Sequence, residues 1–362
     1  MAIAQHTISR ANAGEPTLAE KVAFLSQRAA YPYPVSKVTP QETHMSWVFL
    51  ADDKVYKLKK PVRFPYLDFS TLARREAACR AELNLNRRLA PDVYLDFVPL
   101  VATPRGLSIG GAGEVADWLV VMRRLKDSWA LDRSIDEDRV ETPQLDRLVI
   151  VLGRFYSHAR RPYVTPGAEL WEWKRNIATD SRVLLDRRFN LPSGPIWTVE
   201  RAERSFLSRR GDTLLKRIRD RRIVDGHGDL RPEHIWLCYG IKIIDCLEFN
   251  PRLRAVDPFD ELAYLSLECE RLGAAWIGDY VCRGVSRLLH DDPGPELFLF
   301  YRCHRALLRA RLAVAHLMEP NPRTPEKWPQ RARAYLSIAV RDAARLERLL
   351  RTPGGRSAAA PR

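Results

Sequence analysis

Short runs rich in β-branched and aromatic residues occur in the first third of the chain. The segments 46–51 (SWVFLA) and 54–59 (KVYKLK) have the composition of strands, and the acidic pair Asp52-Asp53 between them is a typical turn sequence. The segments 93–100 and 114–121 have a similar character. This pattern predicts a small antiparallel sheet.

Helical periodicity dominates the rest of the chain. Apolar residues recur every three or four positions in six segments, which are 18–28, 68–89, 142–158, 257–272, 297–317 and 329–350. Thr142-Pro143 and Asp257-Pro258 are typical starts of helices, because the first residue can cap and proline suits the first turn. Helices are also expected to fill 161–222. This region contains the tryptophans Trp171, Trp173 and Trp197, which are predicted to be core residues. The alternative is that they stack on a substrate.

A further pair of apolar runs, 235–237 and 241–244, flanks the turn 238–240 and predicts a β-hairpin. Asp229 precedes this hairpin and Asp245 follows it directly, sixteen residues later. A hairpin can bring both acids to the same edge. Two converging carboxylates beside a nucleotide suit phosphoryl transfer, in which one takes the proton of the acceptor hydroxyl and the other holds Mg²⁺.

The sequences HGDLRPEHI (227–235) and IIDCLEFN (243–250) resemble the catalytic and metal-binding loops of the aminoglycoside phosphotransferase family, relatives of the choline kinases. With ETHMSWVFL (42–50) and VYKLKKPV (55–62), they are most similar to a bacterial branch of that family. The resemblance implies an α+β, bilobal, protein-kinase-like fold with a small antiparallel-sheet N-lobe and a larger, mostly helical C-lobe. The expected boundaries are an N-terminal extension and helix (1–30), the N-lobe (31–122), the C-lobe (123–351) and a disordered tail (352–362).

The resemblance also implies roles for single residues. Asp229 is expected to be the catalytic base, Asp245 to bind Mg²⁺, and Lys57 to bind the phosphates of ATP. Val55 lies on the same strand face as Lys57, because strand side chains repeat every two residues, and is expected against the base. Lys59 points the same way and is the reserve candidate for the phosphate contact.

Two further positions complete the expected nucleotide site. Kinases of this fold use a glutamate to orient the lysine, since an ion pair fixes a flexible ammonium. Glu82 is the candidate for this role, and Glu76 is its rival. Met122 begins the segment Met122–Leu125, expected to be the hinge whose backbone meets adenine.

The chain departs from the family pattern in three places. His234 stands where the family has asparagine as second metal ligand, and an imidazole is better suited to Mn²⁺ than to Mg²⁺. The triplet after the metal-binding acid is not Asp-Phe-Gly, and Glu248 is expected either to add an oxygen ligand or to pair with Arg252. The expected glycine-rich phosphate loop is missing, and the hydroxyls and backbone N–H groups of 42–46 are the candidate substitute.

Composition is that of an ordinary globular protein. Of 362 residues, 46% are hydrophobic and 29% charged, and no run approaches the roughly 18 apolar residues of a spanning helix. The six cysteines are scattered and never form CxxC, so a metal cluster or disulfide framework is poorly supported. With no apolar signal core near the start, we expect a cytoplasmic protein with reduced thiols and no membrane association.

The net charge of +14 raises the question of an anionic partner. Basic residues are densest over 201–222, but they are mixed with acids, which favours a solvated helix face over a nucleic-acid-binding surface. The absence of GxxxxGK[ST] argues against a Walker-type ATPase in this chain. Members of the similar branch are often joined to a P-loop ATPase domain, so a separate protein of that kind is a candidate partner.

The sequence therefore predicts an ATP-dependent phosphotransferase that acts on a hydroxyl of a small molecule, with Mg²⁺ or Mn²⁺ as cofactor. The alternative is a kinase-shaped, catalytically weak module that binds nucleotide and regulates a partner. A third alternative, which the charge pattern favours less, is a basic nucleic-acid-binding protein.

Overall fold

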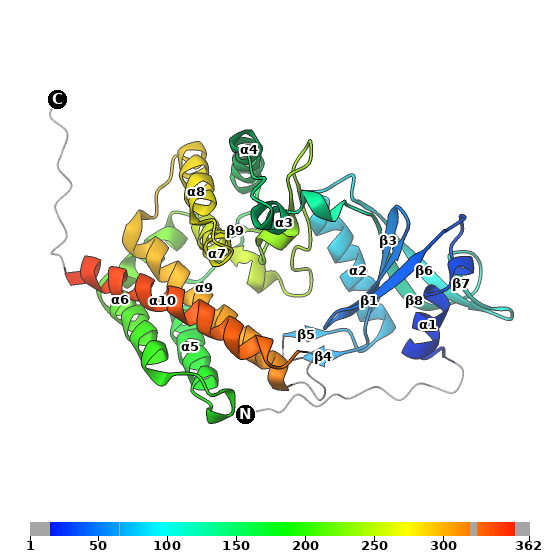
Figure 1. Cartoon of the computed structure of the whole chain (residues 1–362), viewed down its shortest axis with the longest axis horizontal. Coiled ribbons are helices and arrows are strands. Elements are labelled where there is room, and N and C mark those ends of the chain that lie inside the picture. The colour runs from blue at the N-terminus through cyan, green and yellow to red at the C-terminus, as the bar shows by residue number, and fades with distance from the viewer. Residues whose placement is uncertain (1–14, 65, 319–323, 352–362) are drawn as a thin grey trace. The chain divides into compact units, whose positions relative to one another are not determined.

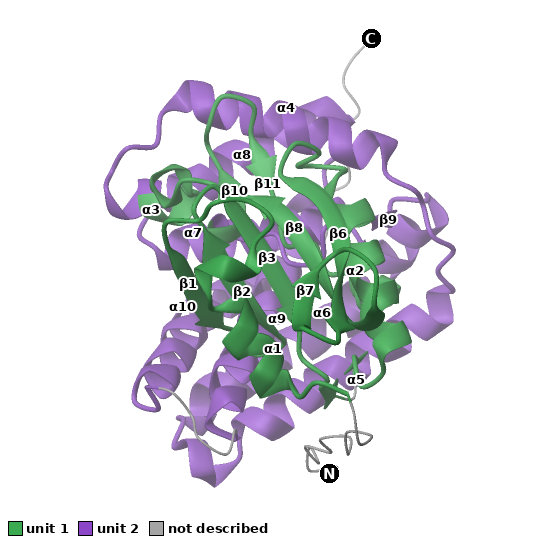
Figure 2. Cartoon of the chain, turned by 90° about the vertical axis from the view of Figure 1, so that its right-hand side faces the viewer, with its two compact units in different colours: residues 1–133, 233–254 green, residues 134–232, 255–362 purple. Residues whose placement is uncertain are grey.

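The computed structural model describes residues 15–64, 66–318 and 324–351. The chain divides into two compact units, a sheet unit of residues 1–133 and 233–254 and a helical unit of residues 134–232 and 255–362 (Figure 2). The predicted tail 352–362 and the first fourteen residues of the predicted extension lie outside the described residues. The sheet unit contains residues 233–254, which the sequence analysis expected with the C-lobe.

A six-stranded antiparallel sheet is the centre of the sheet unit (Figure 1). In the order of the sheet, its strands are β1 (Val38–Glu42), β2 (Ser46–Ala51), β3 (Lys54–Lys59), β8 (Glu114–Arg123), β6 (Tyr94–Thr103) and β7 (Gly106–Ile109). The predicted hairpin 46–51/54–59 is confirmed to the residue, with Asp52 in the left-handed turn conformation at φ 51°. The edge strands β1 and β7 were not predicted.

Two hydrophobic clusters cover the faces of this sheet. Tyr56 and Leu58 of β3 pack with α1 (Leu18–Leu25) and with the 3₁₀ turn Arg28–Ala30, whereas Val55 packs with the cluster under α2 (Leu72–Asn86). The predicted helix 18–28 is thus split into two elements. The predicted helix 68–89 is real but shorter, because Thr71 caps it, accepting a hydrogen bond from the Arg74 N–H at 3.3 Å.

The second hairpin joins the sheet unit through backbone hydrogen bonds. Its strands are β10 (Ile235–Trp236) and β11 (Lys242–Ile243), as predicted but shorter. The Leu237 N–H donates to the Trp129 carbonyl at 2.7 Å, and Trp236 forms a bridge with Ala130. Smaller elements of this unit are β4 (Arg63–Phe64), β5 (Leu67–Asp68) and the 3₁₀ turns Asp127–Trp129 and Pro251–Arg254.

Long helices make up most of the helical unit. The helices are α4 (Thr142–His158), α5 (Pro166–Leu184), α6 (Ser193–Arg219), α7 (Pro258–Arg271), α8 (Ala275–Leu289), α9 (Gly294–Ala315) and α10 (Lys327–Arg351). A two-stranded ladder pairs β9 (Val224–Asp225) with β12 (Ala255–Val256), and 3₁₀ turns cover Arg187–Phe189 and His316–Met318. Two short elements contain the points in the sequence where one unit gives way to the other. They are the helix α3 (Leu131–Asp136) and the 3₁₀ turn Pro232–His234.

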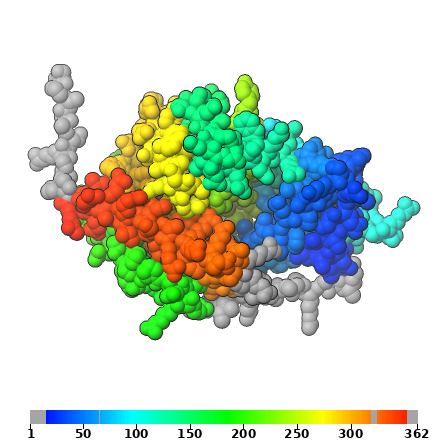
Figure 3. Space-filling view, in the orientation of Figure 1, coloured from blue at the N-terminus to red at the C-terminus, as the bar shows by residue number. Residues whose placement is uncertain are grey.

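Helix α7 is buried along most of its length, from Pro258 to Cys269. Its charged side chains are therefore paired: Asp260 accepts two hydrogen bonds from Arg305 of α9, at 2.7 and 2.6 Å. The predicted helix 142–158 is confirmed at both ends, but its N-cap is Glu141 and not the predicted Thr142, which is already helical. One side of α10 lies at the surface (Figure 3, orange to red). Across the described parts of the chain, none of the helices has the combined length and apolar character that crossing a bilayer requires.

The prediction that three tryptophans are core residues is wrong for two of them. Trp171 is 60% exposed and Trp197 is 55% exposed. Both lie on amphipathic helices whose outer faces are largely polar, so a single large ring can remain at the surface. Trp173 instead packs edge-on against His304, with ring centroids 4.6 Å apart.

The close crossing of α8 over α7 at Gly278 gives a stability prediction. A Cβ added at Gly278 would lie 2.5 Å from the Ser266 Cα, so Gly278→Ala should lower the free energy of unfolding by about 1–3 kcal/mol. Gly194 of α6 has open space around it and is the control, for which alanine should cost nothing. Urea unfolding of both variants checks this, and equal stability would contradict the packing described.

Candidate functional site

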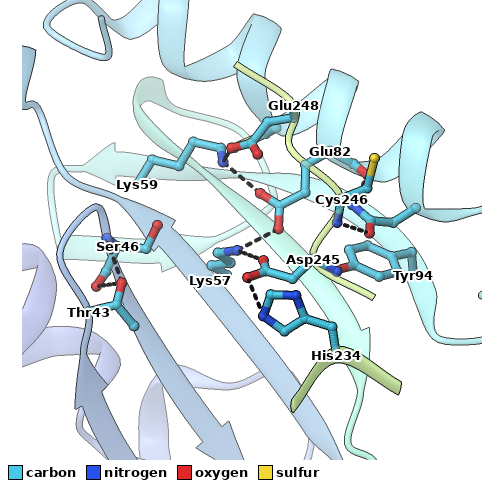
Figure 4. Close-up of polar contacts among 12 residues, drawn as sticks. Thr43, Ser46, Lys57, Lys59, Glu82, Tyr94, His234, Asp245, Cys246 and Glu248 are labelled. Carbon is cyan, nitrogen blue, oxygen red and sulfur yellow. Dashed lines mark hydrogen bonds and ion pairs between the residues drawn. The ribbon is translucent and has the colours of Figure 1, made fainter. Parts of the chain in front are cut away.

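The residues predicted for a nucleotide site meet on one face of β3. Lys57 Nζ donates to Glu82 Oε1 of α2 at 2.8 Å and to Asp245 Oδ1 at 2.9 Å (Figure 4). Lys59 shares this face, because strand side chains alternate. Three segments far apart in the sequence thus supply one cluster of charges.

Lys57 and Lys59 differ in accessibility. Lys59 Nζ binds Glu82 Oε2 at 2.6 Å and also Glu248, and its side chain is 1% exposed, compared with 17% for Lys57. Glu248 therefore pairs with Lys59 and not with Arg252, the partner expected in one of its two predicted roles. Of the two lysines, Lys57 is the one that a ligand can reach.

The charges of this cluster support one another. Burial alone would lower the pKa of Lys57, but the carboxylates of Asp245 and Glu82 outweigh it and raise that pKa well above its ordinary value. Burial would raise the pKa of Glu82, but the two lysines lower it. Glu248 differs, because burial raises its pKa although Lys59 opposes the shift.

Asp245 lies at the end of β11 in the left-handed backbone conformation, with φ 63°. Its N–H donates to the Tyr94 hydroxyl at 3.2 Å, and the Cys246 N–H donates to Asn86 Oδ1 at 2.8 Å. Asn86 in turn donates to the Glu82 carbonyl at 2.9 Å. The loop after β11 is therefore tied to α2 and β6.

The Asp245 carboxylate and His234 form the candidate metal site. The side chain of Asp245 is 48% exposed, and its Oδ2 lies 3.6 Å from His234 Nε2. In residues 15–64, 66–318 and 324–351, no group of three or more His, Cys, Asp or Glu side chains could hold a metal ion. The donor set fits a divalent ion that takes most of its ligands from phosphate and water, as Mg²⁺ commonly does.

Val55 and Met122 lie opposite each other in the ladder between β3 and β8. Both belong to the hydrophobic cluster that packs under α2, and Met122 is 7% exposed. Val55 is only partly buried, so it presents apolar surface beside Lys57. Contact of Val55, or of the backbone at Met122, with a base stays a prediction.

The candidate phosphate loop at 42–46 forms a tight turn between β1 and β2. The Thr43 N–H donates to the Ser46 carbonyl at 2.8 Å, and the Ser46 N–H donates to the Thr43 hydroxyl at 3.0 Å (Figure 4). The Thr43 hydroxyl also donates to the Ser46 carbonyl at 2.9 Å. These groups satisfy one another inside the turn, so the described conformation does not aim them at a phosphate.

Asp229 belongs to the helical unit and is held by two side chains. The Tyr264 hydroxyl donates to Asp229 Oδ1 at 3.1 Å, and Arg231 lies 3.0 Å from Oδ2. The expectation that Asp229 and Asp245 meet at one edge stays a prediction.

Glu261 of α7 contacts the loop that carries Asp229. Its Oε1 accepts a hydrogen bond from the Gly228 N–H, and its Oε2 accepts one from Tyr156 at 3.0 Å. A Cβ at Gly226 would lie 2.8 Å from Glu261 Oε2, so the loop needs glycine there. Sequence alone gave no signal for Glu261 beyond its place in the first turn of a predicted helix.

The basic segment 201–222 lies mostly on α6 and is interspersed with carboxylates. Arg204 pairs with Glu200 at 2.7 Å, Arg210 with Glu296 at 3.0 Å, and the buried Arg217 with Asp257 at 2.5 Å. The exposed Arg204 agrees with the predicted solvated helix face, whereas Arg217 is buried and departs from it.

Comparison with solved structures identifies the fold. A choline/ethanolamine kinase family protein from Mesorhizobium loti matches with a TM-score of 0.51 and 19% identity, covering 92% of this chain and 95% of that one. A thermostable mutant of an aminoglycoside phosphotransferase, in its apo form, matches with a TM-score of 0.50 and 13% identity, covering 89% and 99%. The predicted α+β, protein-kinase-like fold is therefore confirmed.

Sequence comparison finds relatives of unknown activity. Uncharacterized proteins of Mycobacterium bovis and Mycobacterium tuberculosis are 34% identical over 289 residues, which is 78% of this chain and 56% of each relative. The chain thus spans little more than half the length of these relatives. No family model matches it. Membership of the bacterial phosphotransferase branch stays a prediction.

The charge cluster gives a test that separates Glu82 from its rival Glu76. Replacing Glu82 with Gln should lower the free energy of unfolding by about 3 kcal/mol, because the buried Lys59 and the partly buried Lys57 both lose a partner. The control Glu76→Gln removes only the exposed pair with Arg80 and should cost less than about 0.5 kcal/mol.

The same pair of variants has a predicted pH dependence. The pKa of Glu82 lies below its ordinary value of 4.5, so its stabilisation is complete above that pH and is lost as pH falls further. The stability difference between wild type and Glu82→Gln, followed by urea unfolding, should therefore shrink below pH 4.5. A difference that does not change with pH would contradict a charged Glu82.

Proposed function

We propose that this protein transfers the γ-phosphoryl group of ATP to a hydroxyl of a small molecule. The observation that carries the proposal is the accessible Lys57 ammonium, held between the buried Glu82 and the half-exposed Asp245 on the sheet of a kinase-like fold. An ammonium fixed by one carboxylate and adjacent to a second, exposed one suits triphosphate binding together with a divalent cation.

In this proposal Lys57 donates hydrogen bonds to the nucleotide phosphates, and Glu82 fixes the direction of its side chain. Val55 and the backbone at Met122 contact the base. Asp245 and His234 would hold Mg²⁺ or Mn²⁺, which when bound neutralises phosphate charge. The greater exposure of Lys57 compared with Lys59 supports Lys57 as the phosphate ligand.

Asp229 is proposed to orient the acceptor hydroxyl and to take its proton. The acceptor oxygen forms a bond to the γ-phosphorus while the bond from that phosphorus to the β–γ bridging oxygen breaks, and ADP leaves. The proton of the hydroxyl passes to the Asp229 carboxylate. Hydrogen bonding from Tyr264 and ion pairing with Arg231 fix that carboxylate, and orientation is a large part of catalysis in this reaction class.

A nucleotide-binding regulatory module is the second candidate. Two observations favour it: the turn 43–46 uses its hydroxyl and N–H groups internally, and His234 stands in place of an amide ligand. Such a module would bind nucleotide with no stimulation of ATP consumption by any hydroxyl compound. A separate P-loop ATPase partner and a cytoplasmic location stay predictions.

Activity is tested by screening hydroxyl compounds with γ-labelled ATP. Asp229→Asn should leave folding intact and lower turnover by about 10²–10⁴-fold, because the base is lost while the nucleotide site remains. Wild-type turnover by this variant would refute the role of Asp229. Nucleotide binding without turnover by wild-type protein would favour the regulatory module.

Nucleotide binding is tested by titrating a fluorescent ATP analogue. Lys57→Met should weaken binding by roughly 10- to 100-fold, the loss expected for a charge-assisted hydrogen bond. Lys54→Met is the matched control. Lys54 lies on the same strand, but its ammonium packs over the Tyr33 ring, 4.2 Å from the ring centroid, so its loss should leave nucleotide affinity unchanged. Equal affinity of the Lys57 and Lys54 variants would contradict the proposed contact.

The metal preference depends on His234. An amide oxygen is a harder ligand than imidazole, so His234→Asn should shift the metal preference from Mn²⁺ toward Mg²⁺. Nucleotide affinity measured with each metal reports this shift. An unchanged ratio of the two affinities would show that His234 does not contact the ion.

A further inference from the structure

The cluster around Glu82 contains a second ion pair that the proposed roles do not use. Lys59 Nζ contacts both Glu82 and Glu248, and the three side chains are nearly fully buried (Figure 4). Burying a charge costs free energy unless the charge is paired. Glu248 is therefore held at the sheet by its contact with Lys59, because moving it away would break a buried ion pair. The pair therefore links β3 and α2 to the loop that follows β11.

Glu248 is three residues after Asp245 and belongs to the same loop. This loop has no regular secondary structure from Ile244 to Asn250, so local contacts determine its path. Near its start, Tyr94 and Asn86 accept hydrogen bonds from the N–H groups of Asp245 and Cys246. The Arg254 guanidinium donates to the Leu247 carbonyl at 2.6 Å, and the contact of Glu248 with Lys59 is a further tether, beyond the residue with left-handed backbone.

The second lysine also changes what Lys57 can do. Glu82 has one carboxylate oxygen on each lysine, Oε1 on Lys57 and Oε2 on Lys59. If Lys57 turns toward a phosphate, Lys59 still neutralises Glu82. Removal of Lys57 from its present partners therefore does not leave Glu82 as an unpaired buried charge.

We propose that Lys59 and Glu248 form a positioning ion pair that holds the Asp245 loop on the sheet and frees Lys57 to bind phosphate. The consequence for Lys57 rests on the proposed function, whereas the consequence for the loop does not. Lys59 itself is not expected to touch the nucleotide, because it is 1% exposed.

The loop is tested by hydrogen exchange of the amides of Asp245 and Cys246 in the full chain without nucleotide. Glu248→Gln keeps the shape of the side chain but removes its charge, and should speed exchange of both amides by roughly tenfold. The control is Lys60→Met, which removes a neighbouring ion pair with Glu42 and should leave these amides unchanged. Unchanged exchange in Glu248→Gln would overturn the proposal.

A double variant distinguishes a role of the Lys59–Glu248 pair in holding the Asp245 loop from a role in global stability alone. Lys59→Met combined with Glu248→Gln removes both charges, so it should recover the global stability that Lys59→Met alone loses. Exchange of the Asp245 and Cys246 amides should nevertheless stay fast in the double variant. Recovery of slow exchange would show that the pair serves stability alone and would overturn the positioning role.

Binding of the fluorescent ATP analogue with Mn²⁺ distinguishes this inference from the proposed function. Glu248→Gln should weaken binding several-fold, and Lys59→Arg should bind more tightly than Lys59→Met. If wild-type protein binds no nucleotide, the proposed function fails. The exchange result would still show whether the Lys59–Glu248 pair holds the Asp245 loop on the sheet. If wild type binds and Lys59→Met binds equally well, the role of Lys59 in freeing Lys57 is refuted, because Glu82 would then lack a partner whenever Lys57 turned toward phosphate.

Discussion

The partly buried contact of Lys57 with Glu82 and Asp245 is the interaction on which the rest of the sheet unit depends. A charge removed from water is tolerated only when its partners are in place. Here a lysine on a strand has one partner on a helix and another on a loop 188 residues away along the chain. Correct pairing therefore requires β3, α2 and the Asp245 loop to be positioned together. The same requirement fixes the direction of Lys57, the more exposed of the two lysines in this cluster.

The cluster contains more carboxylates than ammonium groups, and its most exposed carboxylate is that of Asp245. Two ammonium groups, Lys57 and Lys59, face three carboxylates, those of Glu82, Asp245 and Glu248. The excess negative charge lies at the most exposed member, since Glu82 and Glu248 are nearly buried. A divalent cation at Asp245 would compensate that charge, and phosphate oxygens would complete its coordination.

Some of this architecture could be predicted because local signals agree with the final fold. The hairpin 46–51/54–59 has strand-forming residues on both sides of an acidic turn. Helix α4 begins at a capping sequence and ends at His158, four residues before Pro162. The pairing of Lys57 with Glu82 followed from family resemblance together with strand alternation. In each case short-range sequence carried the information.

Other features depend on tertiary contacts that leave no local pattern. The edge strand β1 contains Pro40 and lacks alternation, so only its pairing with β2 defines it. Lys59 looks like an exposed strand lysine, and its burial follows from Glu248, which lies 189 residues away. Glu261 is one acid among several at the start of α7, and its contact with the Gly228 N–H exists only once the loop has folded onto it.

Lysine labelling with an amine-reactive reagent, read by mass spectrometry, tests the central claim most directly. With a divalent cation and an ATP analogue at saturating concentration, labelling of Lys57 should fall strongly, while labelling of Lys54 on the same strand should stay the same. Equal labelling of Lys57 with and without bound analogue would contradict the account, because the phosphates would then lie elsewhere.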